Sequence, residues 1–117
     1  MKIIITGGNG FIAKNIADHL KKNNEIILLC RSKDKIKKNH KKNYKIFKFD
    51  LKKKIIPKLN CDILIHAAGI TPQKKYSAKE YMDVNYLSLK SIFNNINIKK
   101  RFIYFSTTDI YKDESDY

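Results

Sequence analysis

The feature that most constrains this chain is a short apolar strand that runs directly into a glycine-rich turn. Residues 2–6 read Lys-Ile-Ile-Ile-Thr, and this β-branched run predicts a strand that is buried on both faces of a sheet. Residues 7–10 read Gly-Gly-Asn-Gly, and apolar residues at helical spacing begin at Phe11. We therefore expect a strand–turn–helix unit in which the turn presents backbone N–H groups at a helix N-terminus, where anions bind.

Strand-like and helix-like segments alternate along the rest of the chain. Further strands are predicted at 25–30, 44–49, 61–66 and 101–106. Helices are predicted from Phe11 to Lys22 and from about Ser77 to Asn95. Residues 31–43 are polar and lysine-rich and are predicted as loop or weak helix, and 51–60 as a connection with little periodicity. This alternation predicts an α/β fold, a doubly wound parallel sheet of the Rossmann type with strand order 3-2-1-4-5.

The apolar spacing also predicts which face of each helix is buried. For the first helix, the predicted buried side chains are Phe11, Ile12, Ile16, His19 and Leu20. For the second helix, they are Tyr81, Val84, Leu87, Leu89, Ile92 and Phe93.

Length and composition fit one domain, which we expect to occupy residues 1–117. No apolar run approaches the roughly 18 residues that a membrane span needs, and the N-terminus has no signal-peptide pattern. Cys30 and Cys61 have neither metal-ligand nor C-x-x-C spacing, so we expect reduced thiols, no metal and a cytoplasmic protein.

The net charge of +14 raises the alternative of an anionic partner such as nucleic acid or a membrane surface. However, the lysines are scattered, and only two of the 25 basic residues are arginine. A nucleic-acid surface more often places arginine and aromatic side chains together on one face. We therefore expect no nucleic-acid or membrane partner; steeply salt-dependent DNA affinity would contradict this expectation.

The glycine turn stands where a dinucleotide fingerprint requires it, between the first strand and the first helix. Gly7 permits a tight turn, and Gly10 lets the backbone approach a pyrophosphate without an intervening Cβ. Ala13 is small enough for the helix to pack closely on the sheet. A Walker-type phosphate loop is excluded because no Gly-Lys-[Ser/Thr] follows.

The motif Thr-Gly-x-x-Gly-x-x-[Gly/Ala] at residues 6–13 resembles the extended short-chain dehydrogenases, in their nucleotide-sugar epimerase/dehydratase branch. Four further segments match that family in order: 50–51, 66–69, 84–85 and 105–111. The resemblance implies a nicotinamide dinucleotide cofactor and a nucleotide-sugar substrate. It implies contacts to the cofactor from Gly7, Gly10, Phe11, Ile12, Asp50, Leu51, Ala67, Ala68 and Gly69, and the chemistry of the residues after the second strand adds Arg31. We expect His66 and Asn85 to pack behind the site rather than to act in catalysis.

The end of the second strand bears on the choice between NAD and NADP. NAD enzymes usually carry an acidic residue there, but this chain has Cys30 followed by Arg31, and Asp34 lies too far along. A guanidinium can bind a 2′-phosphate bidentately, so the sequence favours NADP and leaves NAD as the alternative.

By resemblance, the hydroxyl that contacts the substrate belongs to Thr107, with Ser106 as the alternative. The acid/base tyrosine would be Tyr117, but no lysine follows four residues later, as the family pattern requires. We therefore interpret the chain as the N-terminal part of a longer epimerase, dehydratase or reductase, inactive alone and able to form a homodimer. A non-catalytic NADP(H)-binding module is the alternative.

Overall fold

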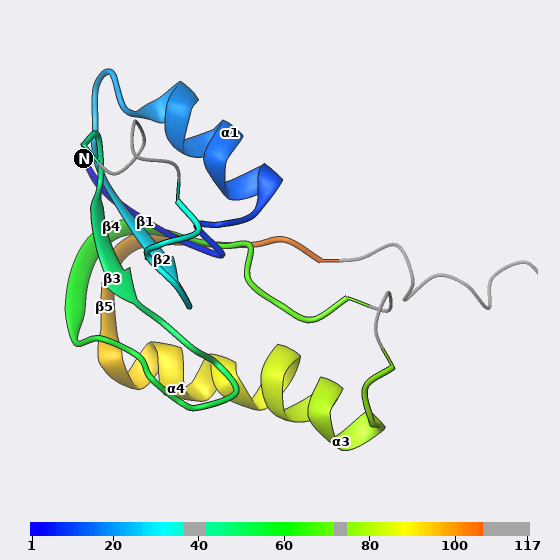
Figure 1. The fold of residues 1–117 in the computed structure, drawn as a ribbon. Coiled ribbons are helices and arrows are strands. Elements are labelled where there is room, and N and C mark those ends of the chain that lie inside the picture. The colour runs from blue at the N-terminus through cyan, green and yellow to red at the C-terminus, as the bar shows by residue number, and fades with distance from the viewer. Residues whose placement is uncertain (37–41, 72–74, 107–117) are drawn as a thin grey trace, which may run out of the picture.

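The fold is a single parallel sheet of five strands, with the predicted order β3-β2-β1-β4-β5. It is seen in a computed structural model that describes residues 1–36, 42–71 and 75–106 (Figure 1). The strands are β1 (Lys2–Thr6), β2 (Glu25–Cys30), β3 (Lys45–Lys48), β4 (Leu59–His66) and β5 (Ile96–Tyr104). Every pair of neighbouring strands is parallel, so the carboxyl ends of the strands share one edge of the sheet.

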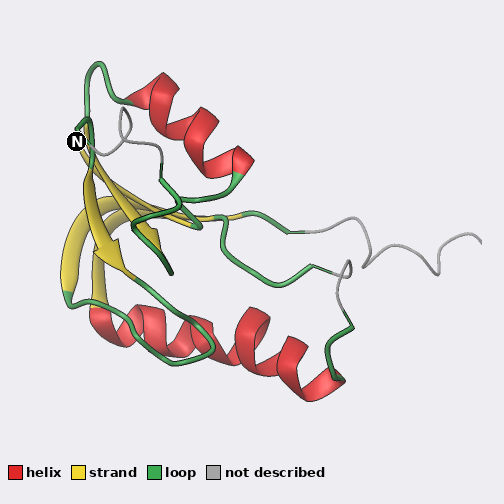
Figure 2. Cartoon of the chain, in the orientation of Figure 1, coloured by secondary structure: helices red, strands yellow, loops and turns green. Residues whose placement is uncertain are grey.

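Helices cover both faces of the sheet. Helix α1 (Phe11–Leu20) lies on one face. A continuous helical run, formed by α3 (Ala78–Tyr81), the π-helical segment η1 (Met82–Leu87) and α4 (Ser88–Asn95), lies on the other (Figure 2). No helix among the described residues is long and apolar enough to cross a membrane.

The apolar core forms two layers, one on each face of the sheet. In β1, Ile3 and Ile5 join the layer under α1, whereas Ile4 joins the layer under α4. All three side chains are at most 2% exposed. This alternation within one apolar run confirms that β1 is buried on both faces, as expected for a central parallel strand.

The predicted buried face of α1 was wrong in part. Ala13 and Ala17 are the buried residues of this helix, with Ile16 and Leu20 only partly buried. Phe11, Ile12 and His19 are exposed. Two alanines one turn apart let the helix axis approach the sheet closely, and the larger side chains flank this contact.

The predicted buried face of the second helix also needs correction. Val84, Ser88 and Ile92 are buried, whereas Leu87 and Phe93 are about half exposed. The π-helical segment explains the difference, because its wider turn rotates the following residues away from the phase of an α-helix. The expectations for Val84 and Ile92 were confirmed.

Strand β5 begins five residues before the predicted start at Arg101. Cys61 pairs with Ile98 and Ile63 pairs with Arg101, so β5 has one more residue than β4 between these two pairs. This β-bulge at Lys99–Lys100 interrupts the apolar alternation that would have revealed the start of the strand.

Candidate functional site

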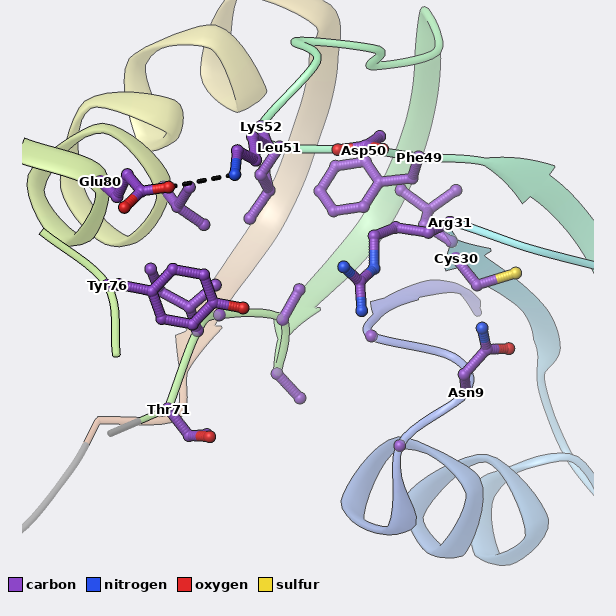
Figure 3. Close-up of a pocket in the computed structure, with 18 residues that line it drawn as sticks. Asn9, Cys30, Arg31, Phe49, Asp50, Leu51, Lys52, Thr71, Tyr76 and Glu80 are labelled. Carbon is purple, nitrogen blue, oxygen red and sulfur yellow. Dashed lines mark hydrogen bonds and ion pairs between the residues drawn. The ribbon is translucent and has the colours of Figure 1, made fainter. Parts of the chain in front are cut away.

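The carboxyl ends of the strands open onto a cavity of about 590 Å³, a size typical of small-molecule sites. It lies between the N-terminus of α1 and the α3–η1 run, where the strand order reverses around β1 (Figure 3). Ligands of open α/β sheets bind at this switch point. The lining residues are Gly7, Asn9, Gly10, Leu29, Cys30, Arg31, Phe49, Asp50, Leu51, Lys52, Ala67, Ala68, Gly69, Ile70, Thr71, Tyr76, Glu80 and Val84.

The glycines of the turn are required for different reasons. Gly7 has φ +74°, and a Cβ there would lie 3.0 Å from the carbonyl oxygen of Ala67. A Cβ on Gly8 would lie 3.0 Å from Cβ of Leu28. At Gly10 the one contact of such a Cβ within 4 Å is the Gly7 carbonyl oxygen, at 3.1 Å. Gly7 and Gly8 are therefore required by protein packing, whereas Gly10 mainly leaves room at the start of α1.

Thr6 organises the loop that follows β4. Its Oγ1 accepts hydrogen bonds from the backbone N–H groups of Ala67 (3.1 Å) and Ala68 (3.0 Å). The hydroxyl proton is then free to donate to Nδ1 of His66, 2.8 Å away. This network assigns the ring proton of neutral His66 to Nε2, and it fixes two residues of the cavity wall.

His66 is 1% exposed, which agrees with the expected packing role. Burial lowers the pKa of its imidazole from 6.5 to about 4, so the ring is neutral at pH 7. Nε2 has no hydrogen-bond partner among the described residues, and the rings of Phe102 and Tyr104 are stacked with the imidazole ring. The ring supports the loop and is poorly suited to proton transfer.

Asn85 holds the next part of the same loop from the opposite side. It lies in η1, and its side chain exchanges two hydrogen bonds with Ile70. Oδ1 accepts from the Ile70 N–H at 2.9 Å, and Nδ2 donates to the Ile70 carbonyl at 3.1 Å. A Cβ on Gly69 would lie 3.1 Å from Asn85 Oδ1, so a glycine permits this close approach. The expected role of Asn85 behind the site agrees with these contacts.

The opposite wall is formed by the segments after β2 and β3. Arg31 is exposed and lines the cavity, and Asn9 Nδ2 donates to the neighbouring Ser32 carbonyl at 3.1 Å. Cys30 is buried, and burial raises the pKa of its thiol, which disfavours the reactive thiolate. Asp50 Oδ1 accepts from the Lys53 N–H at 3.1 Å, within a turn closed by pairing of Asp50 with Ile55.

The structure brings most of the predicted cofactor residues together around this cavity. The ones that line it are Gly7, Gly10, Arg31, Asp50, Leu51, Ala67, Ala68 and Gly69. Phe11 and Ile12 begin α1 beside it, with side chains 82% and 47% exposed. Thr107 and Tyr117 lie outside the described residues.

Sequence reasoning did not single out several residues of the site. Lys52 and Tyr76 gave no usable signal, because the chain is rich in lysine and tyrosine throughout. Thr6 was part of the matched motif at residues 6–13, but no role was predicted for its side chain. Glu80 could have been found from the Ser-x-x-Glu pattern that begins at Ser77, which predicts a capping box. No group of three or more potential metal ligands occurs within the residues that the structure describes.

Comparison with known proteins identifies relatives of this fold. The chain matches the solved structure of Helicobacter pylori ADP-L-glycero-D-manno-heptose-6-epimerase with a TM-score of 0.72 and 23% identity, over 96% of this chain and 41% of the epimerase. The Bacillus cereus UDP-glucuronic acid 4-epimerase in complex with NAD gives a TM-score of 0.68 and 20% identity, over 97% and 42%. Escherichia coli serine dehydrogenase gives 0.61 and 19%, over 81% and 54%.

These solved structures share the fold, and the chain spans about two fifths of the length of the two epimerases. No curated protein sequence matches the chain. The model of the NAD dependent epimerase/dehydratase family matches residues 3–116, nearly the whole sequence. This chain therefore belongs to the NAD-dependent epimerase/dehydratase family.

Proposed function

We propose that this chain is the cofactor-binding part of an NAD(P)-dependent epimerase, dehydratase or reductase that acts on a nucleotide sugar. Residues 1–117 would then form one incomplete Rossmann domain, inactive without the rest of the enzyme. The observation that carries the proposal is the cavity at the switch point, bounded by the glycine turn on one side and by the loop after β4 on the other.

The residues present fit a dinucleotide. Gly10, the residue before α1, provides no side-chain hydrogen bond to the first turn of the helix, which leaves the N–H groups of that turn for a pyrophosphate. Because the adenosine half of a dinucleotide lies over the second strand in this fold, Arg31, Asp50 and Leu51 would contact adenosine. Ala67–Gly69 would then lie toward the nicotinamide.

We further propose that the cofactor is NADP rather than NAD. The end of β2 offers a buried thiol at Cys30 and an exposed guanidinium at Arg31, where NAD enzymes usually carry an acidic residue. An arginine can bind a phosphate bidentately, and this supports the choice of NADP.

The bound nicotinamide would supply hydride transfer to or from the sugar. The chain's own contribution would be to bind and orient the dinucleotide. By resemblance to the family, Thr107 would hydrogen-bond the substrate, and Tyr117 would exchange its proton. If no lysine follows this tyrosine in the complete protein, the alternative of a non-catalytic NADP(H)-binding module is favoured.

The test is a titration of the purified chain with NADPH and with NADH, followed by nicotinamide fluorescence, with circular dichroism to establish folding. We expect NADPH to bind more tightly. Arg31→Glu should weaken NADPH binding by at least about tenfold, the loss of one charge-assisted phosphate contact, and leave NADH nearly unchanged. Lys33→Glu is the matched control for net charge. Equal losses for both cofactors would remove the NADP assignment, and a folded chain that binds neither would overturn the proposed function.

A further inference from the structure

At one side of the cavity an ion pair joins two walls that are far apart in the sequence. Nζ of Lys52 lies 3.1 Å from Oε1 of Glu80 (Figure 3). Lys52 belongs to the turn that follows β3, and Glu80 belongs to α3 on the other side. Both residues line the cavity.

Other hydrogen bonds already hold the side chain of Glu80 and the backbone turn that contains Lys52. The second oxygen of Glu80, Oε2, accepts from the Ser77 N–H (2.9 Å) and from the Ser77 hydroxyl (3.2 Å). The hydrogen bond from the Ser77 N–H is the largest cause that lowers the pKa of the Glu80 carboxyl, and the hydrogen bond from Lys52 lowers this pKa further. The carboxyl therefore stays charged near neutral pH. Lys52 lies in the turn closed by pairing of Asp50 with Ile55. Glu80 therefore loses little side-chain entropy when the ion pair forms.

We infer that Lys52 and Glu80 are positioning residues that close the adenosine end of the cavity over a bound dinucleotide. The inference rests on the proposed function. Lys52 directly follows Asp50 and Leu51, the residues placed beside adenosine, so the pair lies at that end of the ligand rather than at the nicotinamide end. While the ion pair is closed, a dinucleotide bound beneath it should be released more slowly.

This arrangement predicts a kinetic effect on ligand release. Lys52→Gln and Glu80→Gln should each raise the dissociation rate of NADPH, by roughly two- to fivefold at low salt, since exposed ion pairs are weak. Glutamine at position 80 can still serve as the capping residue, so the helix end should be retained. The difference from the wild type should disappear at high salt, where the wild-type pair is screened.

The experiment measures NADPH release by stopped-flow fluorescence and the affinity for 2′,5′-ADP, which lacks the nicotinamide half. The double variant should behave like either single variant if both residues act through one pair. Lys79→Gln is the matched control, because Lys79 pairs with Asp83 at 2.6 Å on the same helical run but does not line the cavity. It should leave release unchanged.

The outcomes separate this inference from the proposed function. If the folded wild-type chain binds neither NADPH nor NADH, the proposed function fails and the inference fails with it. If the wild type binds, the inference alone is overturned by unchanged release in the two Gln variants, by additive effects in the double variant, or by an equal effect of Lys79→Gln. It is likewise overturned if affinity for 2′,5′-ADP is unaffected.

Discussion

At the scale of single residues, Gly7 and Gly10 differ in what surrounds them. Gly7 faces the backbone of the loop after β4, and its positive φ disfavours any side chain. Gly10 has an extended backbone, φ −79° and ψ 158°, and little protein around its missing Cβ. The two positions should therefore respond differently to substitution.

Gly10→Val should weaken NADPH binding by at least about tenfold and lower the unfolding midpoint less than a substitution at Gly7, because the added side chain meets the ligand and only one protein atom, the Gly7 carbonyl oxygen. Gly7→Ala is the contrasting control and should lower the free energy of unfolding by about 1–3 kcal/mol, from backbone strain and the close Ala67 carbonyl. Fluorescence titration and thermal unfolding separate the two effects. Unchanged affinity in Gly10→Val would exclude the turn from the pyrophosphate site.

His66 predicts how stability depends on pH. Its pKa is about 4 in the folded protein and near 6.5 when unfolded, so the unfolded chain binds the extra proton between these values. The contribution of neutral His66 to the free energy of unfolding should therefore be fully present above pH 6.5 and decrease by about 1–3 kcal/mol as the pH drops toward 4. Urea unfolding at pH 7.0 and pH 4.8 measures this loss. His66→Leu should be less stable at both pH values but lose much less between them; an equal loss in the variant would assign the pH dependence to other groups.

At the scale of elements, the sequence predicted the strands better than the helix faces. Buried strands such as β1 and β2 are continuous apolar runs, and a run is visible without knowing what packs on it. The buried face of a helix depends on its distance from the sheet. The contact through Ala17 and the π-helical turn before Ser88 are tertiary features that apolar periodicity does not record.

The residues of the candidate site also divide into those that local sequence patterns predict and those that only the folded structure brings together. Backbone-based parts, such as the turn at Gly10 and the loop at Ala67, follow from small residues at fixed positions after strands. Side chains such as Lys52 and Glu80 come together only because the walls of the cavity face each other. Their pairing depends on the folded geometry, and no local pattern encodes it.

The close approach of α1 gives a prediction at this scale. Ala17 is 0% exposed and packs in the layer with Ile3, Ile5 and Leu28. Ala17→Leu should lower the free energy of unfolding by about 1–3 kcal/mol, because the larger side chain has no space and must push the helix outward. Asn15→Leu, on the exposed side of the same helix, is the control and should change stability little. If the Ala17→Leu variant is as stable as the wild type, α1 adjusts freely on the sheet.

At the scale of the whole molecule, the two edge strands of the sheet differ in chemistry. In the described part of the chain, β3 pairs only with β2, and β5 pairs only with β4. β3 carries Lys45 and Lys48, and charged side chains protect an edge from pairing with another chain. β5 carries three exposed cations in its middle, Lys99 to Arg101. Its end and the residue after it, Phe102 to Phe105, carry no charge, and Ile103, Tyr104 and Phe105 are each more than a third exposed.

We therefore expect this chain to self-associate through β5, against the general repulsion from its charge of +14. Sedimentation velocity should show association that grows with protein concentration and with salt, because salt screens the repulsion. Ile103→Lys should reduce this association, since it puts a charge on the apolar edge. Phe47→Lys is matched to it, with the same 37% exposure but on β3, and should leave association unchanged. A chain that is monomeric at all concentrations in high salt, or equal effects of both substitutions, would show that the β5 edge does not drive self-association.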